Sequence, residues 1–355
     1  MFNIIGKRTD NTSAQTAPGT MQGLWTGIGS PDEITQPTTI GTTSLLFLGD
    51  IMLDRGVRAR IQNIGADEVF VRFTKELSAN YSYTIANLEG PITTWKSRTI
   101  GEDGRGIPGF SFTFPTSSAQ HIKESGIDVV SLANNHTENF GTEGLQQTFD
   151  WLTRAGVTYV GTPTNSSLST TTCAAICISY IGYNHFTQYR EEDVFSEIRT
   201  LRPTSDLIII LPHWGVEYEQ LPKPSQITLA HAWIDAGADA IIGMHPHVIQ
   251  SFEWYNNAPI FYSLGNYLFD QYFSYETTHG LAVGLVYTTE HSRTTLSHIN
   301  LIPIDNTSSK TRGTTPEHSQ RILRTLQDIS RATTPAVMNN QILQGTIYAS
   351  LRGSE

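Results

Sequence analysis

Five short apolar runs, each ending in polar residues, constrain the fold of this chain more than any other feature. The runs are SLLFLGD, TIANLE, VVSLANNH, IIILPH and AIIGMHPH. Their lengths and bounding residues are typical of buried strands. Segments with helical periodicity alternate with them, over residues 66–77, 116–126, 142–156 and 224–237. Strands that alternate with helices predict an α/β fold in which helices cover a parallel sheet.

The remaining segments divide the chain into three parts. Residues 1–43 are rich in Thr, Gly, Ser and Pro and lack apolar periodicity, which predicts a flexible lead-in. Residues 44–305 contain the alternating strands and helices. Two strand-like segments near the end of this part, 280–288 and 296–304, indicate an antiparallel or mixed portion of sheet. Residues 306–355 are expected to form a polar loop and a helical extension with one apolar stripe.

Charge and hydropathy exclude two classes of partner. The 355 residues carry a formal net charge of -10 and contain no run of Lys or Arg, whereas general affinity for nucleic acid requires basic patches. No stretch approaches the ~20 apolar residues of a membrane helix, and the first residues lack the apolar region of a signal peptide. We therefore expect a chain without a membrane segment, located in the cytoplasm, or outside it if a leader has been removed.

The two cysteines, Cys173 and Cys177, lie four residues apart in a segment that is typical of one strand. On one strand their side chains would share a face but would lie too far apart to bridge easily. We therefore interpret both as small apolar residues of the core.

The polar residues that end the five runs belong to few chemical types. The carboxyl ends of parallel strands form one edge of a sheet, where ligands bind, so these side chains are expected to converge. They are Asp50, Asn87, Glu89, Asn134, Asn135, His136, His213, His245 and His247. Carboxylate, amide and imidazole groups without thiolate suit Zn, Mn, Fe or Mg. A pair of such ions bridged by a carboxylate can activate water for displacement at phosphorus.

Taken singly, each of these residues has a common structural explanation. A histidine after a strand is usually a hydrogen-bonded structural residue, and an asparagine in a tight turn is often an Asx-turn residue. The pair formed by His245 and His247 is more specific, because it places two imidazoles near one point. Five strand ends of the same chemical type favour a shared site over five independent turns.

Six motifs connect the chain to a known family: FLGDIMLDRGV, ANLEGPIT, VVSLANNHTENFGTEGL, ILPHWGVEYE, GADAIIGMHPHVIQ and PIFYSLGNYLFDQ. In this order, over about residues 44–270, they resemble the CapA family. That family is the capsule and poly-γ-glutamate biosynthesis branch of the calcineurin-like metallophosphoesterases. The resemblance implies a four-layer α/β/β/α sandwich with mixed sheets over residues 44–305, and a binuclear centre of two divalent ions, Mn, Zn or Fe.

The resemblance also implies a role for each matching residue. His136 would donate a proton to the leaving group, and Arg55 would grip an anionic substrate through its forked guanidinium. The implied metal ligands are Asp50 and His247 for the first ion, Glu89 as the bridge, and Asn135, His213 and His245 for the second ion.

Two residues depart from the pattern of the wider superfamily or of the family. Met52 stands where the superfamily has a metal-binding histidine, a loss that the CapA branch shares, so the first ion is expected to bind more weakly. Asp54 replaces a residue that is often glycine, and we expect it to face solvent. Glu217 is interpreted as an acceptor that orients His213, since a metal-bound histidine usually donates its other N–H.

Three more residues in the motifs are candidates for binding substrate. Trp214 and Tyr218 either line a substrate cleft or cover the edge of the sheet. Asn266 either contributes to the site or holds a loop.

Two hypotheses of function follow. The first is a metallophosphoesterase-like hydrolase, in which metal-activated water attacks a phosphoester or related bond and His136 protonates the leaving group. The alternative is a non-catalytic accessory protein of poly-γ-glutamate or capsule polymer synthesis or export, which binds anionic polymer or partner proteins. Under both hypotheses the ligand is an anionic small molecule or polymer.

Overall fold

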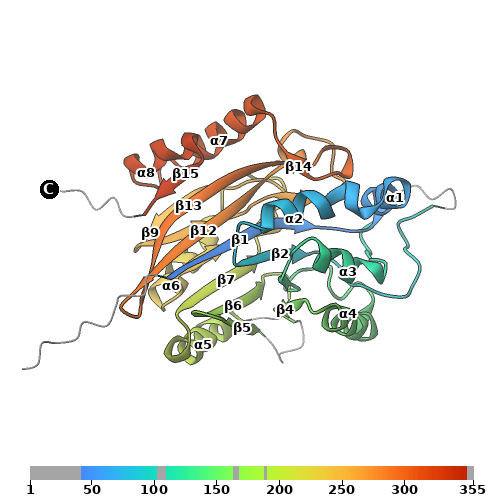
Figure 1. Cartoon of the computed structure of the whole chain (residues 1–355), viewed down its shortest axis with the longest axis horizontal. Helices are drawn as coiled ribbons and strands as arrows, with labels where there is room; N and C mark the ends of the chain where they lie inside the picture. The colour runs from blue at the N-terminus through green and yellow to red at the C-terminus, as the bar shows by residue number, and fades with distance from the viewer. Residues whose placement is uncertain (1–40, 102–108, 163–167, 188–189, 350–355) are drawn as a thin grey trace, which may run out of the picture. The chain divides into compact units, whose positions relative to one another are not determined.

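Two mixed β-sheets form the centre of the structure (Figure 1). The computed structural model describes residues 41–101, 109–162, 168–187 and 190–349. Most of the expected lead-in, up to residue 40, lies outside these described residues, whereas Gly41 already begins the first strand.

The first sheet has nine strands, of which β1 is central. Strand β1 pairs in parallel with β2 on one side and antiparallel with β12 on the other. The order is β14-β13-β12-β1-β2-β3-β4, with β11 paired to β1 and β15 paired to β13. The strands are β1 (Gly41–Ile51), β2 (Tyr83–Leu88), β3 (Val129–Ser131), β4 (Thr158–Val160), β11 (Asn266–Leu268), β12 (His279–Glu290), β13 (Arg293–Asp305), β14 (Arg312–Gly313) and β15 (Thr346–Tyr348).

The second sheet has six strands in the order β5-β6-β7-β8-β10-β9. Its four inner strands run parallel, and each edge strand pairs antiparallel with its neighbour. The strands are β5 (Ser169–Cys173), β6 (Cys177–Asn184), β7 (Leu207–His213), β8 (Ala240–Ile242), β9 (Phe252–Tyr255) and β10 (Ala258–Phe261).

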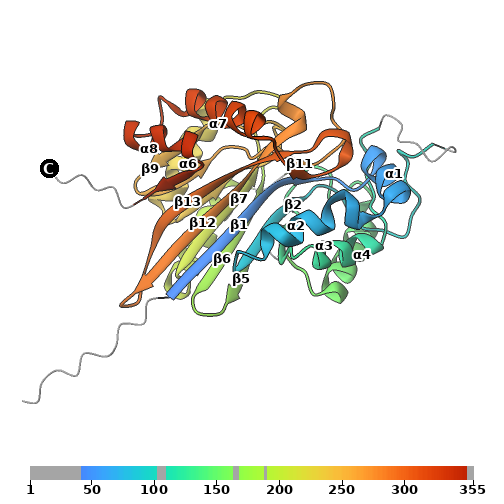
Figure 2. The same cartoon turned by 45° about the horizontal axis from the view of Figure 1, so that its top comes forward.

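Side chains alternate between the two faces of β1, and both faces are buried. Leu45 and Phe47 contribute to an apolar layer between the sheets. Ile209 and Ile242 of the second sheet pack in the same layer. Leu46 and Leu48 belong instead to an apolar cluster on the outer face of the first sheet. Figure 2 shows the two sheets one behind the other, with β1 and β2 in front of β6 and β7.

Helices cover the outer face of each sheet. Residues of α3 and α4 are buried against the first sheet, and residues of α5 and α6 against the second. The four layers confirm the expected α/β/β/α sandwich with mixed sheets. The helices are α1 (Arg55–Ile64), α2 (Arg72–Ser78), α3 (Ser117–Glu124), α4 (Gly141–Ala155), α5 (Glu191–Leu201), α6 (Pro224–Asp235), α7 (Pro316–Ser330) and α8 (Ala336–Gln341).

The segment after residue 305 packs on the same core. Ile322, Leu323 and Leu326 of α7 are buried in the apolar layer that also lies between the sheets. Strand β15 adds to the first sheet through β13. Thr315 caps α7 by accepting a hydrogen bond from the backbone N–H of His318.

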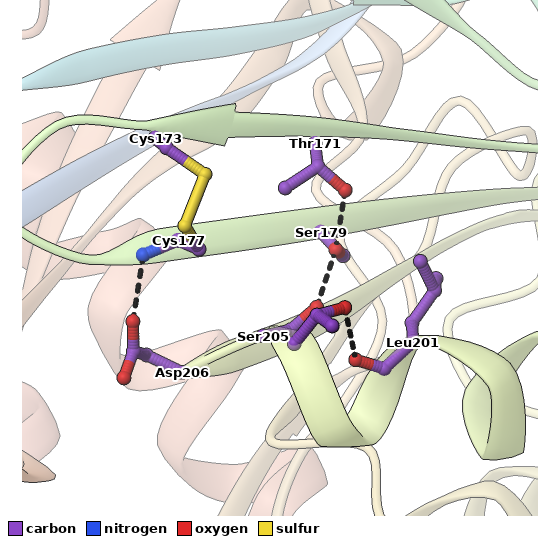
Figure 3. The surroundings of a disulfide bond; sticks show 8 residues. Thr171, Cys173, Cys177, Ser179, Leu201, Ser205 and Asp206 are labelled. Carbon is purple, nitrogen blue, oxygen red and sulfur yellow. Dashed lines mark hydrogen bonds between the residues drawn. A yellow bond between two sulfur atoms is a disulfide. The ribbon is translucent and has the colours of Figure 1, made fainter.

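The interpretation of the two cysteines as core residues is wrong, because the segment around them is a hairpin rather than one strand. Strands β5 and β6 pair antiparallel with Cys173 opposite Cys177, and their Cα atoms lie 4.1 Å apart. The two residues form a disulfide across the hairpin (Figure 3), and Cys173 is exposed.

The disulfide makes a testable prediction. Replacement of both cysteines by serine should lower the free energy of unfolding by about 2 kcal/mol or less, because the closed loop is short and restricts the unfolded chain little. Urea unfolding measures this change. Alkylation followed by mass spectrometry should label neither cysteine before reduction and both after it. Labelling without reductant would contradict the bond.

Candidate metal centre

Strand ends from both sheets bring five titratable side chains together. Asp50 lies near the end of β1, Glu89 directly follows β2 and His213 ends β7, whereas His245 and His247 follow β8. All five are buried, with at most 4% of their surface exposed. The structure therefore brings these five side chains together at one edge of the sheets.

A bulge in β1 sets the position of Asp50. The register of β1 against β2 shifts between Phe47 and Asp50. Asp50 then donates its backbone N–H to the carbonyl of Gly265, at 3.1 Å, beside β11. Bulges of this kind re-aim side chains next to functional sites.

Four residues around the site have left-handed backbone conformations that non-glycine residues rarely adopt. Their φ angles are 48° for Arg55, 67° for Tyr218, 99° for His245 and 59° for His247. Such conformations cost on the order of 1–3 kcal/mol each and persist where the surroundings enforce them. Their presence at this one place is typical of a functional site.

Three nitrogen and oxygen atoms of candidate ligand residues lie close together on one side of the site. The Nε2 atom of His213 is 2.9 Å from Oδ1 of Asn135 and 3.1 Å from Nδ1 of His245. Ligand atoms that share one ion about 2.1 Å away lie roughly 3 Å apart. The spacing of these three atoms therefore fits one bound ion.

The surroundings of the Glu89 carboxylate indicate whether the site suits metal ions. Glu89 is fully buried, and both of its carboxylate oxygens lack a hydrogen-bond partner. Its Oε1 lies 3.7 Å from Nε2 of His247 and 3.9 Å from Nε2 of His136. A buried carboxylate without partners is unfavourable unless a cation compensates it. This side chain fits the bridging position between two divalent ions.

Asn266 determines which nitrogen of His247 faces the site. The amide N–H groups of Asn266 are used by Gln271 and by the carbonyl of Thr277, each at 2.9 Å. Its oxygen therefore accepts the Nδ1–H of His247, at 3.0 Å. In the neutral ring, which a bound cation favours, the Nε2 lone pair of His247 is left to bind an ion, so Asn266 acts here by orienting a ligand.

Burial sets the protonation of most of these imidazoles. It lowers the pKa of His213, and it lowers the pKa of His245 to about 3. Burial also acts to lower the pKa of His247, but the charges of Glu89 and Asp50 raise that pKa to about 9. Burial raises the pKa of the Glu89 carboxyl. Neutral imidazoles such as His213 and His245 are the form that binds metal.

His136 lies beside this group with one nitrogen held. Its Nδ1 is 3.1 Å from Oδ1 of Asn139, which also accepts the backbone N–H of Phe112. Nδ1 therefore carries the proton, and Nε2 faces Asn135 and Glu89. Burial lowers the pKa of His136 to about 4.

Arg55 lies at the start of α1, next to the site. Its guanidinium pairs with Asp270 and donates to the carbonyl of Gly109. It also lies over the rings of Phe112 and Phe269, 4.9 and 5.5 Å from their centroids. Its Nε is buried without a hydrogen-bond partner. One donor of Arg55 is therefore uncommitted.

Trp214 has no exposed surface and covers the end of the sheet. It stacks on Trp233 and donates its indole N–H to the carbonyl of Tyr262, at 2.9 Å. A Cβ on Gly243 would lie 2.0 Å from the same Tyr262 oxygen, so only glycine fits there. This burial favours the second of the two expected roles of Trp214, as a cover for the sheet edge.

Tyr218 faces the site from the loop that follows β7. It is 42% exposed, and its ring centroid lies 6.2 Å from that of His247. Its hydroxyl accepts a hydrogen bond from Gln271, at 3.2 Å. Tyr218 is therefore placed where it could contact a ligand at the metal centre.

Comparison with known proteins identifies the family. The model of the family described as bacterial capsule synthesis protein PGA_cap matches residues 44–271. The chain belongs to this family. The capsule biosynthesis protein CapA of Bacillus anthracis is 30% identical over 250 residues, which cover 64% of this chain and 60% of that protein. The PGA biosynthesis protein CapA of Bacillus subtilis (strain 168) is 28% identical over 247 residues, 64% of this chain and 63% of that protein.

The chain thus spans less than two thirds of the length of these two capsule synthesis relatives. Among solved structures, the calcineurin-like phosphoesterase YfkN of Bacillus subtilis aligns with 86% of this chain and 99% of its own, at 14% identity and a TM-score of 0.48. A likeness this distant says nothing about activity. Within the described residues, no helix has both the length and the apolar character that a bilayer span requires.

The two residues that depart from the pattern are both buried. Met52 packs in the apolar cluster outside the first sheet, and its sulfur accepts the backbone N–H of Asp54. Asp54 was expected to face solvent, but this expectation is wrong. Asp54 is 0% exposed. Its carboxylate is compensated there by Arg58, at 2.8 Å, and by hydrogen bonds that it accepts from Ser97 and Thr113. Asp54 therefore holds the start of α1 in place.

Glu217 does not contact His213 as expected. The Nδ1 atom of His213 lies 3.3 Å from the amide nitrogen of Asn87 instead. The Glu217 carboxylate lies near His245 and His247, and ligand atoms of the three residues are all within 4.8 Å of one another. Glu217 is therefore placed to contact an ion held by one of these two histidines.

Sequence reasoning did not assign roles to several supporting residues. The amide of Asn87 donates to Asp50 at 2.7 Å, and Asn134 donates to the Asn87 oxygen at 3.1 Å. Both residues were noticed at strand ends, but a local pattern does not show which partner an amide meets. Asn139 and Asp270, which hold His136 and Arg55, lie in motif segments that carried no distinct signal.

The position of Glu217 makes a prediction about metal affinity. Glu217→Gln should weaken Mn²⁺ binding about tenfold or more, because it removes a negatively charged oxygen that could contact the ion. Isothermal titration calorimetry measures the affinity. Glu219→Gln is the matched control, since Glu219 lies in the same loop and pairs with Lys223. Equal affinities for Glu217→Gln and the unchanged chain would contradict the role of Glu217.

Proposed function

We propose that this capsule synthesis family protein is a metal-dependent hydrolase of a phosphoester or a related bond. The observation that carries the proposal is the fully buried, unpartnered carboxylate of Glu89. Further possible ligand residues surround it, with the Asn135, His213 and His245 atoms spaced for one ion. A clustered set of this kind supports binding of two divalent ions, with Glu89 between them.

The residues assigned to the metals divide into two groups. Asn135, His213 and His245 would hold one ion, whereas Asp50 and His247 would hold the other. Mn, Zn or Fe suits these oxygen and nitrogen ligands. When bound, the pair supplies Lewis acidity, which activates a water and offsets charge that develops on the phosphoryl group.

His136 is suited to move a proton at the edge of this centre. Asn139 holds its Nδ1–H, so Nε2 is the atom that exchanges a proton with the leaving group. The pKa of His136 is lowered by burial to about 4. An anionic substrate beside the ring raises that pKa, because an opposite charge favours the imidazolium. The donor form is thus favoured once substrate is bound.

Arg55 supports the binding of an anionic substrate. Asp270 and the two aromatic rings hold its guanidinium in one orientation. The uncommitted Nε of Arg55 can donate to an anionic oxygen. Tyr218, partly exposed beside His247, would contact the same ligand.

No feature of the described site favours the accessory role in polymer synthesis or export. Binding of a polymer without chemistry does not explain the positioned His136 or the buried, unpartnered carboxylate of Glu89. Of the two expected locations, the disulfide supports the extracytoplasmic one, because disulfides persist in oxidising compartments.

The proposal predicts a separation of metal binding from catalysis. With Mn²⁺ bound, the chain should hydrolyse at least one member of a panel of phosphomonoesters and phosphodiesters. His136→Ala should lower kcat by roughly 10²- to 10⁴-fold, the usual contribution of a proton-transfer residue, while Mn²⁺ binding persists. His298→Ala, on β13 away from the site, is the control. A metal-loaded chain without activity across the panel would overturn the proposal.

A further inference from the structure

A large cavity within the described residues lies beside the metal centre rather than in it. Its volume is about 910 Å³. Its walls come from α1, from the loop at residues 272–275, from the start of β12 and from the turn at residues 307–309. No acidic residue lines it, and its only arginine is Arg60.

Arg60 differs from the other arginines of α1. Arg55 pairs with Asp270, and Arg58 pairs with Asp54. Arg60 has no acidic partner among the described residues, and its Nε is buried without a hydrogen-bond acceptor. The chain has a formal net charge of -10, so carboxylates are abundant. An unpaired, half-buried arginine on a cavity wall therefore indicates an external anion.

Tyr275 lines the same cavity and carries a second unpartnered donor. The hydroxyl of Tyr275 is buried and has no hydrogen-bond partner. Its ring stacks on His279 and lies under the guanidinium of Arg321, 3.5 Å away, so its position is held. Burial raises the pKa of Tyr275, which keeps the hydroxyl protonated as a donor. Two buried donors without acceptors indicate a ligand group that accepts hydrogen bonds.

Aromatic side chains connect the cavity to the metal centre. Phe273 lines the cavity, is 66% exposed and packs edge-on against Tyr218, with 4.9 Å between ring centroids. Tyr218 in turn faces His247. Tyr272 also lines the cavity, and its hydroxyl forms a hydrogen bond with Ser309. The cavity and the metal centre are thus neighbours along one surface.

We infer that this cavity is a second anion subsite, in which Arg60 and Tyr275 bind a carboxylate or phosphate group of an extended ligand whose reacting bond lies at the metal centre. The inference rests on the proposed function for the reacting end of the ligand. It adds to that function a substrate with at least two separated anionic groups. The exposed rings of Tyr272 and Phe273 would contact the segment of ligand between them.

Binding measurements on the full chain test the subsite separately from the chemistry. The carboxylate probe is a linear γ-linked pentamer of glutamate, and the phosphate probe is tripolyphosphate. Titration in EDTA at low salt removes bound metal ions from the measurement, and comparison with the Arg60 variant isolates the contribution of the subsite. Arg60→Gln should weaken binding of at least one probe about tenfold, the usual effect of losing one charge-assisted hydrogen bond.

Two further variants keep the test specific. Tyr275→Phe keeps the ring on His279 and removes only the hydroxyl, and it should weaken the same probe by a few-fold. Arg199→Gln removes an equal charge from the exposed surface of α5 and should leave the affinity unchanged. The probe that responds to Arg60 identifies the anion as carboxylate or phosphate.

Two outcomes would overturn the subsite. One is failure of both probes to bind the unchanged chain. The other is an equal effect of Arg60→Gln and Arg199→Gln. Hydrolysis of the phosphoester panel together with either outcome would retain the proposed function without the subsite. Binding that depends on Arg60 in a chain that takes up no metal would retain the subsite and reject the proposed function.

Discussion

The buried carboxylate of Glu89 is the constraint on which the rest of the site depends. Both of its oxygens are removed from water, and neither has a hydrogen-bond partner. An isolated buried charge is costly, and a neutral carboxyl group would still lack partners for its polar atoms. Cations shared with the surrounding imidazoles would compensate the charge. The clustered histidines, the strained backbone and the asparagines that orient them are consistent with that need.

The four-layer fold explains how residues far apart in sequence reach Glu89. Both sheets end at the same place, so β1 and β2 supply Asp50 and Glu89 while β7 and β8 lead to the three histidines. The apolar layer between the sheets fixes their separation. The hydrogen bond that Asn87 donates to Asp50, and the one that Asn266 accepts from His247, then orient Asp50 and His247. The core therefore sets where the ligands lie, and the amides set which atoms they present.

The sequence predicted the parts that depend on strong local patterns. The buried strands are apolar runs, so their polar ends could be recognised before the structure. Helices α1 and α5 were missed because they bury little, only Val57 in α1 and Val194 and Ile198 in α5. The cysteine hairpin was missed because the turn residues 174–176 include no Gly, Pro or Asn, the usual turn signals. Long-range partners, such as Arg58 for Asp54, have no local signature.

Anomalous diffraction from crystals of the chain grown with Mn²⁺ tests the account most directly. The account predicts two peaks, one in contact with Asn135, His213 and His245 and one in contact with Asp50 and His247. The Glu89 carboxylate should lie between the peaks. Crystals that show no peak at Glu89, although Mn²⁺ is present in excess, would contradict the central claim.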